Sequence, residues 1–185
     1  MTEEEEKNKK KYLEDMIENR TETHLYFWGG YCSQWHRSKF IVEGIEYNCA
    51  EQYMMAEKAR LFNDQESLYN IMLEYDPRNQ KILGKNVRNF DKAKWDSVCR
   101  LIVYRGNLAK FSQNSGLCDW LLLDTGNLKL VEASPYDNIW GIGLNPCDPL
   151  RFDEKNWKGT NWLGEAIMQV RSDLMTLHQE VILLW

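Results

Sequence analysis

Glu51 and Lys58 are the two residues of this sequence whose types and spacing could most directly support a reaction. They are seven residues apart, or two turns of an α-helix, so a helix would place both side chains on one face. A carboxyl group and an amine on one face can serve as general acid or base and as nucleophile if the site is partly dry. Two structural interpretations compete with this one. Glu51 lies three residues after Asn48, as in a capping box, and Lys58 could be a solvent-facing lysine.

Three further side chains could contribute to such a site. Asp137 follows a predicted strand in a loop, where functional groups are common, although an Asx-turn uses the same residue type. Trp95 and Trp140 could stack on a base or a sugar, although large aromatic residues are mostly packing groups. Position in the sequence does not decide between these interpretations.

Several enzyme classes have signatures that this sequence does not contain. The three histidines lack metal-ligand spacing, and no nucleophile elbow, Walker loop or dinucleotide-binding glycine motif occurs. The lone G-x-G that begins at Gly141, directly after Trp140, more often marks a bend. We therefore expect neither a zinc enzyme, a kinase nor a serine hydrolase, and we expect no metal and no cofactor.

Short strands and longer helices must position these residues. Two β-rich runs at 40–42 and 45–47 flank Glu43-Gly44, whose glycine can adopt a positive φ, and this predicts a hairpin. Asn48 as N-cap predicts a helix that continues to about Phe62. The other predicted elements are strands at 24–28 and 128–133, helices at 64–75, 80–87, 91–111, 117–124 and 162–177, and a loop at 141–157. The pattern predicts a compact, predominantly helical α+β domain with a small sheet and hairpin.

Length and composition fit one globular domain. The 185 residues, of which 43% are hydrophobic and 12% aromatic, suffice to bury a core. We expect a charged N-terminal arm or helix at 1–23 and one domain at 24–185, whose apolar tail Val181–Trp185 could pack on the core or on a partner. No apolar run reaches the roughly 18 residues of a membrane span, and residues 1–11 do not resemble a signal peptide. The five scattered cysteines indicate free thiols, so we expect a cytoplasmic protein.

Charge is unevenly distributed along the chain. The net charge of −5 argues against a general nucleic-acid binder. Residues 78–110 nevertheless contain nine basic residues against Asp91 and Asp96, a local net charge of +7. Such a segment could hold an anionic ligand such as a phosphate or pyrophosphate, or it could be an ordinary solvated helix face.

Ordered sequence blocks run from Phe27 to about Leu174. The first follows the predicted hairpin and reads Glu51-Gln52-Tyr53-Met54-Met55-Ala56-Glu57-Lys58-Ala59. The later blocks are Gly84-Lys85-Asn86-Val87, Trp95, Leu122-Leu123-Asp124-Thr125-Gly126, Leu130-Val131-Glu132-Ala133-Ser134, Asp137, Trp140-Gly141-Ile142-Gly143-Leu144 and Trp157-Lys158-Gly159-Thr160-Asn161-Trp162-Leu163-Gly164. Together they resemble the NADAR family, also called YbiA-like proteins, whose first block has the pattern E-H-Y-x-Q-A-x-K-A.

This resemblance implies a mainly helical α+β domain with N-glycosidase activity. It implies that Glu51 is the catalytic carboxylate and Lys58 the second catalytic group, with Asp137 as a third catalytic residue. The expected substrate-binding residues are Tyr53, Lys85, Trp95, Trp140, Gly141, Asn161 and Gly164. The resemblance implies that Trp95 and Trp140 line the pocket, and that Asn161 and Gly164 shape its phosphate or ribose side.

Three functions are compatible with the resemblance. Some family members remove ADP-ribose from guanine in nucleic acid, and we expect ADP-ribosylated guanine, in nucleic acid or as a nucleotide, to be the substrate. This would involve transient contact with nucleic acid and none with a membrane. Other members are similar to enzymes that hydrolyse ribosylamino-pyrimidine phosphates of riboflavin synthesis. A non-catalytic module that binds ADP-ribose or a nucleotide is the third function.

The sequence departs from the family pattern around the expected pocket. The family His after the glutamate is Gln52, the Gln of its helix is Met55, and its Arg after the glycine is Lys85. The family Ser-Asn-Phe is Ser33-Gln34-Trp35 here. An Arg-to-Lys change loses bidentate phosphate recognition, and a Gln-to-Met change loses an amide. Because the two catalytic groups are retained while their surroundings differ, the reaction class is better predicted than the substrate.

Overall fold

The structure is a computed structural model that describes residues 4, 6–7, 10 and 17–183, with side chains up to residue 178. The predicted arm at 1–23 therefore lies largely outside the described residues, and so do the side chains of Val181–Trp185. Within the predicted arm, Glu18–Arg20 forms strand β1, which the sequence did not predict. The domain boundary after residue 23 stays a prediction.

The chain divides into two units. Unit 1 comprises residues 1–33 and 123–169, and unit 2 comprises residues 34–122 and 170–185. The last passage from one unit to the other lies inside helix α7 (Trp162–Leu183).

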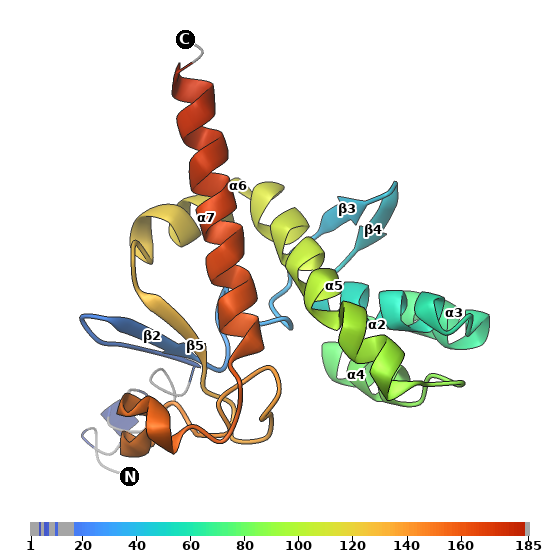
Figure 1. The fold of residues 1–185 in the computed structure, drawn as a ribbon, viewed down its shortest axis with the longest axis horizontal. Helices are drawn as coiled ribbons and strands as arrows, with labels where there is room; N and C mark the ends of the chain where they lie inside the picture. The colour runs from blue at the N-terminus through green and yellow to red at the C-terminus, as the bar shows by residue number, and fades with distance from the viewer. Residues whose placement is uncertain (1–3, 5, 8–9, 11–16, 184–185) are drawn as a thin grey trace. The chain divides into compact units, whose positions relative to one another are not determined.

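Unit 1 is built on a three-stranded sheet. Strand β2 (His24–Phe27) pairs antiparallel with β1 and parallel with β5 (Lys129–Glu132), in the order β1-β2-β5 (Figure 1). Consecutive apolar residues of the two longer strands are buried, namely Leu25, Tyr26, Phe27, Leu130 and Val131. Because successive side chains of a strand point to opposite faces, both faces of this small sheet are covered.

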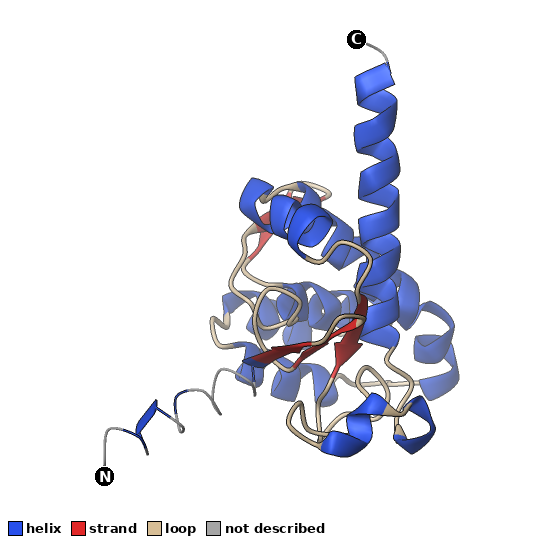
Figure 2. Ribbon diagram, turned by 90° about the vertical axis from the view of Figure 1, so that its left-hand side faces the viewer, coloured by secondary structure: helices blue, strands red, loops and turns tan. Residues whose placement is uncertain are grey.

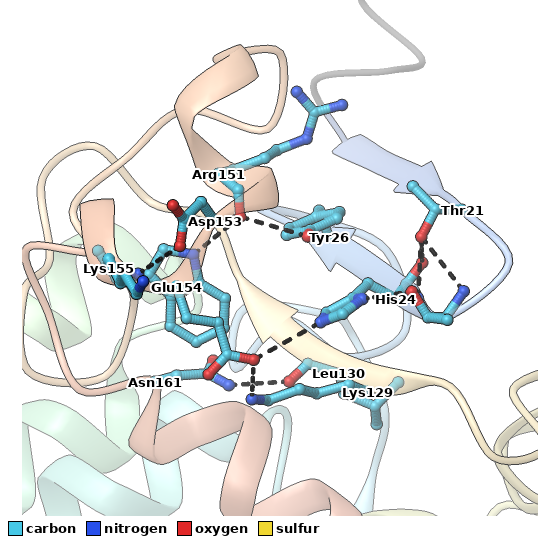
Figure 3. A network of polar contacts seen from close by, with 12 residues as sticks. Thr21, His24, Tyr26, Lys129, Leu130, Arg151, Asp153, Glu154, Lys155 and Asn161 are labelled. Atoms are coloured by element: carbon cyan, nitrogen blue, oxygen red, sulfur yellow. Dashed lines mark hydrogen bonds and ion pairs between the residues drawn. The ribbon is translucent and has the colours of Figure 1, made fainter.

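A long loop follows β5 and contains two short 3₁₀ turns, η2 (Pro149–Phe152) and η3 (Glu154–Asn156). Polar contacts tie this loop to the sheet (Figure 3). The carbonyl of Arg151 accepts hydrogen bonds from the Tyr26 hydroxyl at 3.3 Å and from Trp157 Nε1 at 2.8 Å. Lys129 of β5 also forms an ion pair with Glu154 of η3 at 2.5 Å. The predicted loop is therefore anchored at several points.

Unit 2 begins with the predicted hairpin. Strands β3 (Phe40–Val42) and β4 (Ile45–Tyr47) are antiparallel. Glu43 and Gly44 have positive φ values of 51° and 79°. Since a two-residue type I′ turn requires positive φ at both central residues, the hairpin and its turn are confirmed.

Four helices follow the hairpin, and the first of them packs against the other three. Helix α2 (Ala50–Leu61) contacts α3 (Gln65–Leu73), α4 (Pro77–Lys85) and α5 (Lys92–Ser112), as Figure 1 shows. Gly106 allows the close approach of α5, because a Cβ at this position would lie 2.5 Å from the ring of Tyr53.

The helix predicted at 80–87 begins earlier in the structure. The Asp76 carboxylate accepts a hydrogen bond from the amide of Arg78 and caps α4. Proline is well suited to the first position of a helix, so α4 begins three residues before the predicted Gln80.

The chain then continues through α6 (Ser115–Asp119) into a π-helical turn, η1 (Trp120–Asp124), over the predicted helix at 117–124. Helix predominates over strand in Figure 2, and the predicted α+β class is confirmed. Among the helices of the described residues, none is both long and apolar enough to cross a membrane.

Candidate active site

The N-terminus of α2 carries Glu51, and its capping differs from the prediction. The N-cap is Cys49, not Asn48, and its side chain makes no capping hydrogen bond. Gln52, the third residue of the helix, binds the residue before the N-cap, because its Oε1 accepts from the backbone amide of Asn48 at 2.8 Å. The predicted capping box from Asn48 to Glu51 is therefore wrong. Gln52 makes the bond to the Asn48 amide that this box would have given to Glu51.

Gln52 also connects α2 to the end of α3. Its side chain is buried, and its Nε2 donates to the carbonyls of Ile71, Met72 and Glu74 at 3.1 to 3.3 Å. The last carbonyls of a helix have no partner within that helix, so this amide supplies a donor to the carbonyls of Ile71 and Met72. Gln52, which stands where the family has His, thus holds the start of α2 against the end of α3, directly after Glu51.

Glu51 itself is the second residue of α2 and is only 4% exposed. Its backbone amide donates to the carbonyl of Gln34 at 3.0 Å. Burial favours the neutral carboxylic acid, whereas the positive end of the helix dipole favours the carboxylate. Opposed effects of this kind suit a group that takes up and releases a proton.

Cys49, next to Glu51, is not a competing nucleophile. Burial, with a smaller contribution from the Glu51 charge, raises the pKa of the Cys49 thiol to about 11. Its sulfur donates to Gln80 Oε1 at 3.2 Å. A protonated, hydrogen-bonded thiol is a weak nucleophile.

Lys58 lies two turns further along the same face of α2, about 10 Å along the helix axis. Its Nζ is 4.3 Å from the ring centroid of Phe90 and 5.6 Å from that of Trp95, at the beginning of α5. Burial lowers the pKa of Lys58 below that of an ordinary lysine. No carboxylate within the described residues forms an ion pair with it. The solvent-facing alternative is therefore wrong for Lys58, which is half-buried between aromatic rings.

Tyr53 and Lys85 lie apart from this face. Tyr53 is two residues after Glu51, about 200° around the helix. Its ring packs against Tyr47, with 5.1 Å between the centroids, and against Phe40 at 6.1 Å. Lys85 is the exposed last residue of α4. Of the expected substrate-binding residues of unit 2, the structure thus places Trp95 beside Lys58, whereas Tyr53 and Lys85 lie elsewhere.

Asp137, in unit 1, makes the Asx-turn that was its alternative interpretation. Its Oδ1 accepts hydrogen bonds from the amides of Ile139 at 3.0 Å and Trp140 at 2.8 Å. Trp140 is half-buried and meets Trp162 edge to face, with 5.9 Å between the ring centroids. The catalytic role expected of Asp137 stays a prediction.

Asn161 and Gly164 join the beginning of α7 to β5 within unit 1. The buried Asn161 amide donates to the carbonyl of Leu130 at 2.9 Å (Figure 3). It also accepts from the backbone amide of Glu132 at 2.9 Å. A Cβ on Gly164 would lie 2.1 Å from the carbonyl oxygen of Leu130. Gly141 is similarly close, since its Cβ would lie 2.8 Å from the carbonyl oxygen of Glu132. These contacts give the three residues a structural role, and their expected contact with substrate is still a prediction.

The candidate residues belong to different units. Unit 2 holds Glu51, Tyr53, Lys58, Lys85 and Trp95, and unit 1 holds Asp137, Trp140, Gly141, Asn161 and Gly164. Phe90 was missed, because a single aromatic residue in a loop has no periodicity to identify it. Gln52 was identified only as a departure from the family pattern.

The basic segment at 78–110 is not one free basic face. Lys110 is fully buried. Arg88 forms ion pairs with Asp64 at 2.6 Å and with Glu66 at 3.2 Å. Arg78, Lys85 and Arg105 are exposed, so any anion would meet a few separate cations.

Comparisons with known proteins agree with the sequence blocks. A family model described as NADAR domain matches residues 26–175. A protein of Acanthamoeba polyphaga mimivirus named as an N-glycosidase is 44% identical over 146 residues, which is 76% of this chain and 85% of that protein. The Caenorhabditis elegans protein irg-1 is 38% identical over 177 residues, or 86% of this chain and 83% of that protein. The NMR structure of E. coli YbiA matches with a TM-score of 0.71 at 26% identity, covering 88% of this chain and 90% of YbiA.

Proposed function

This chain belongs to the NADAR family, and on that premise we propose that it is an N-glycosidase that removes ADP-ribose from ADP-ribosylated guanine, in nucleic acid or as a nucleotide. The mimivirus relative is named as an N-glycosidase, which supports the reaction class. The observation that carries the proposal is that Glu51 and Lys58 share one face of α2. The Lys58 amine is half-buried against Phe90 and Trp95.

The proposed reaction uses Lys58 as a nucleophile. A neutral amine can attack a carbon centre, and the lowered pKa of Lys58 increases its neutral fraction. Nζ forms a bond to the anomeric carbon while the bond from that carbon to the base breaks. Glu51 delivers the proton that the departing base takes up.

A Schiff base completes the covalent route. The ring oxygen leaves the anomeric carbon with the bonding electron pair and takes up a proton, so that a protonated imine links the opened ribose to Lys58. Water then adds to this carbon, the amine departs, and the ribose ring closes again. A simpler route needs no adduct, because Glu51 as a carboxylate could activate water for direct attack.

Trp95 is proposed to hold the base. Stacking of a base on an aromatic side chain contributes on the order of 1–3 kcal/mol. Trp95 lies beside Lys58, so a stacked base would be near the amine. Two exposed cations of α4, Arg78 and Lys85, are candidates to bind the pyrophosphate.

The test is incubation of the full chain with an oligonucleotide that carries ADP-ribose on guanine, followed by mass spectrometry. Loss of the complete ADP-ribose mass supports the proposal. An intact oligonucleotide together with hydrolysis of a ribosylamino-pyrimidine phosphate would replace it by the riboflavin-type reaction. Binding of the oligonucleotide without loss of mass would identify a non-catalytic module. The unmodified oligonucleotide and the Glu51→Gln variant are the controls.

A further inference from the structure

Unit 2 contains a cavity that no part of the proposed reaction uses. Its volume is about 490 Å³, and it lies between the β3–β4 hairpin, α2 and α5. Pockets that bind small molecules have volumes of about 300–1,000 Å³. The cavity is therefore large enough for a ligand of its own.

The cavity lies on the face of α2 opposite Glu51. Its lining residues from this helix are Tyr53, Glu57 and Arg60. They follow the spacing i, i+4 and i+7, so they share one side of the helix, roughly 180–240° from Glu51. A ligand here would not compete for the Lys58 face.

The opposite wall is held in place by Gln113 at the end of α5. Its Oε1 accepts from the amide of Ile41, and its Nε2 donates to the carbonyl of Ile41, both at 2.8 Å. These two bonds fix the hairpin edge to α5. The cavity is thus bounded by elements that hydrogen bonds keep together.

Tyr53 provides a hydrogen-bond donor for a ligand. The residue is 3% exposed, and its hydroxyl makes no hydrogen bond within the part of the chain that the structure describes. Burial raises the pKa of Tyr53 to about 12, so the hydroxyl keeps its proton at neutral pH. The neighbouring Tyr47 differs, because its hydroxyl accepts from Arg60 at 2.9 Å.

Arg105 provides a cation. Its side chain is exposed at the cavity and has no ion pair with any described residue. Arg105 and Tyr53 line the same cavity. Arg60, by contrast, is already paired with Glu57.

Apolar side chains form another part of the lining. Ile45 of the hairpin is 39% exposed, and Leu108 and Ala109 line the side formed by α5. Glu43 and Glu57 also line the cavity and balance the charges of Arg60 and Arg105. A polyanion is disfavoured by these two carboxylates, whereas one negative group can pair with Arg105.

We propose that this cavity is a second ligand site, which binds a small organic monoanion with an apolar body. The anionic group pairs with the Arg105 guanidinium and accepts a hydrogen bond from the Tyr53 hydroxyl. The apolar body lies against Ile45 and Leu108. One charge-assisted contact beside an apolar contact surface is typical of small-molecule sites.

The probe for the test is anilinonaphthalene sulfonate, an aromatic monoanion whose fluorescence reports binding. We expect saturable binding of one probe per chain. Arg105→Met should weaken it about tenfold or more, because it removes the charged partner of the sulfonate, and tenfold corresponds to about 1.4 kcal/mol. Tyr53→Phe should weaken it several-fold while keeping the ring that packs against Gly106. Arg78→Met, which removes an exposed arginine of α4, should leave it unchanged.

Two further measurements keep the test decisive. N-phenylnaphthylamine, which has similar rings and no charge, should bind more weakly than the sulfonate. Amide NMR shifts caused by the sulfonate should be largest in β3, β4 and α5. The proposal is overturned if no saturable binding occurs, if both site variants bind as the wild type does, or if the shifts lie elsewhere. Circular dichroism spectra establish that each variant is folded.

Discussion

The Nζ of Lys58 lies 4.3 Å from the centroid of the Phe90 ring, so an amine of α2 is held against the aromatic residue that precedes α5. The centroid of the Trp95 ring lies 5.6 Å from the same Nζ. Water is partly excluded from this amine, which lowers its pKa below that of an ordinary lysine.

Glu51→Gln should abolish most of the turnover without unfolding the protein. The change keeps the size of the side chain and removes the group that exchanges a proton. General acid–base catalysis contributes about 100-fold or more, so kcat/KM with ADP-ribosylated guanine should fall by at least about that factor. Glu66→Gln, at an exposed position of α3, is the matched control. Unchanged kcat/KM in Glu51→Gln would remove this residue from the mechanism.

Borohydride should trap Lys58 to the substrate during turnover. Reduction of the imine fixes the opened ribose to Nζ, and peptide mass spectrometry should locate the added mass on Lys58. Lys58→Arg keeps the positive charge but forms no Schiff base, so it should give no adduct and little turnover. Turnover in the wild type without any adduct would favour direct attack by water.

The contribution of Lys58 to stability should rise with pH. Its pKa is lower in the folded protein than the ordinary value of 10.5, so between these two pKa values the unfolded chain binds more protons. The free energy of unfolding of the wild type, relative to that of Lys58→Met, should therefore increase with pH in this window. Below the folded pKa the difference should be constant. Urea unfolding at several pH values measures it, and a flat difference up to pH 10.5 would contradict the lowered pKa.

Gly164→Ala should destabilise the protein strongly. The added Cβ would lie 2.1 Å from the carbonyl oxygen of Leu130, a backbone atom that cannot move aside easily. Overpacking typically costs about 1–3 kcal/mol, and this contact belongs at the upper end or above. Gly116→Ala in α6 is the control, because its Cβ would meet nothing within 4 Å. Similar urea midpoints for the two variants would show that α7 adjusts easily.

Local sequence signals determined several features of the molecule. The hairpin followed from Glu43-Gly44, because the positive φ of its turn depends only on those two residues. The start of α5 at Asp91 is equally local, since its carboxylate accepts from the amide of Lys94 at 2.9 Å. The shared face of Glu51 and Lys58 followed from helix periodicity, and the ordered blocks identified the family.

The tertiary structure decided what those residues touch. The capping of α2 depends on Gln52, whose other partners lie about twenty residues further along the chain in α3. The environment of Lys58 depends on Phe90, thirty-two residues away, and the amide of Asn161 is bound to β5. Turns and caps are formed by neighbouring residues, so their chemistry is visible in a short window of sequence. Burial, pKa and hydrogen bonding at the candidate site come from residues that only the folded chain brings together.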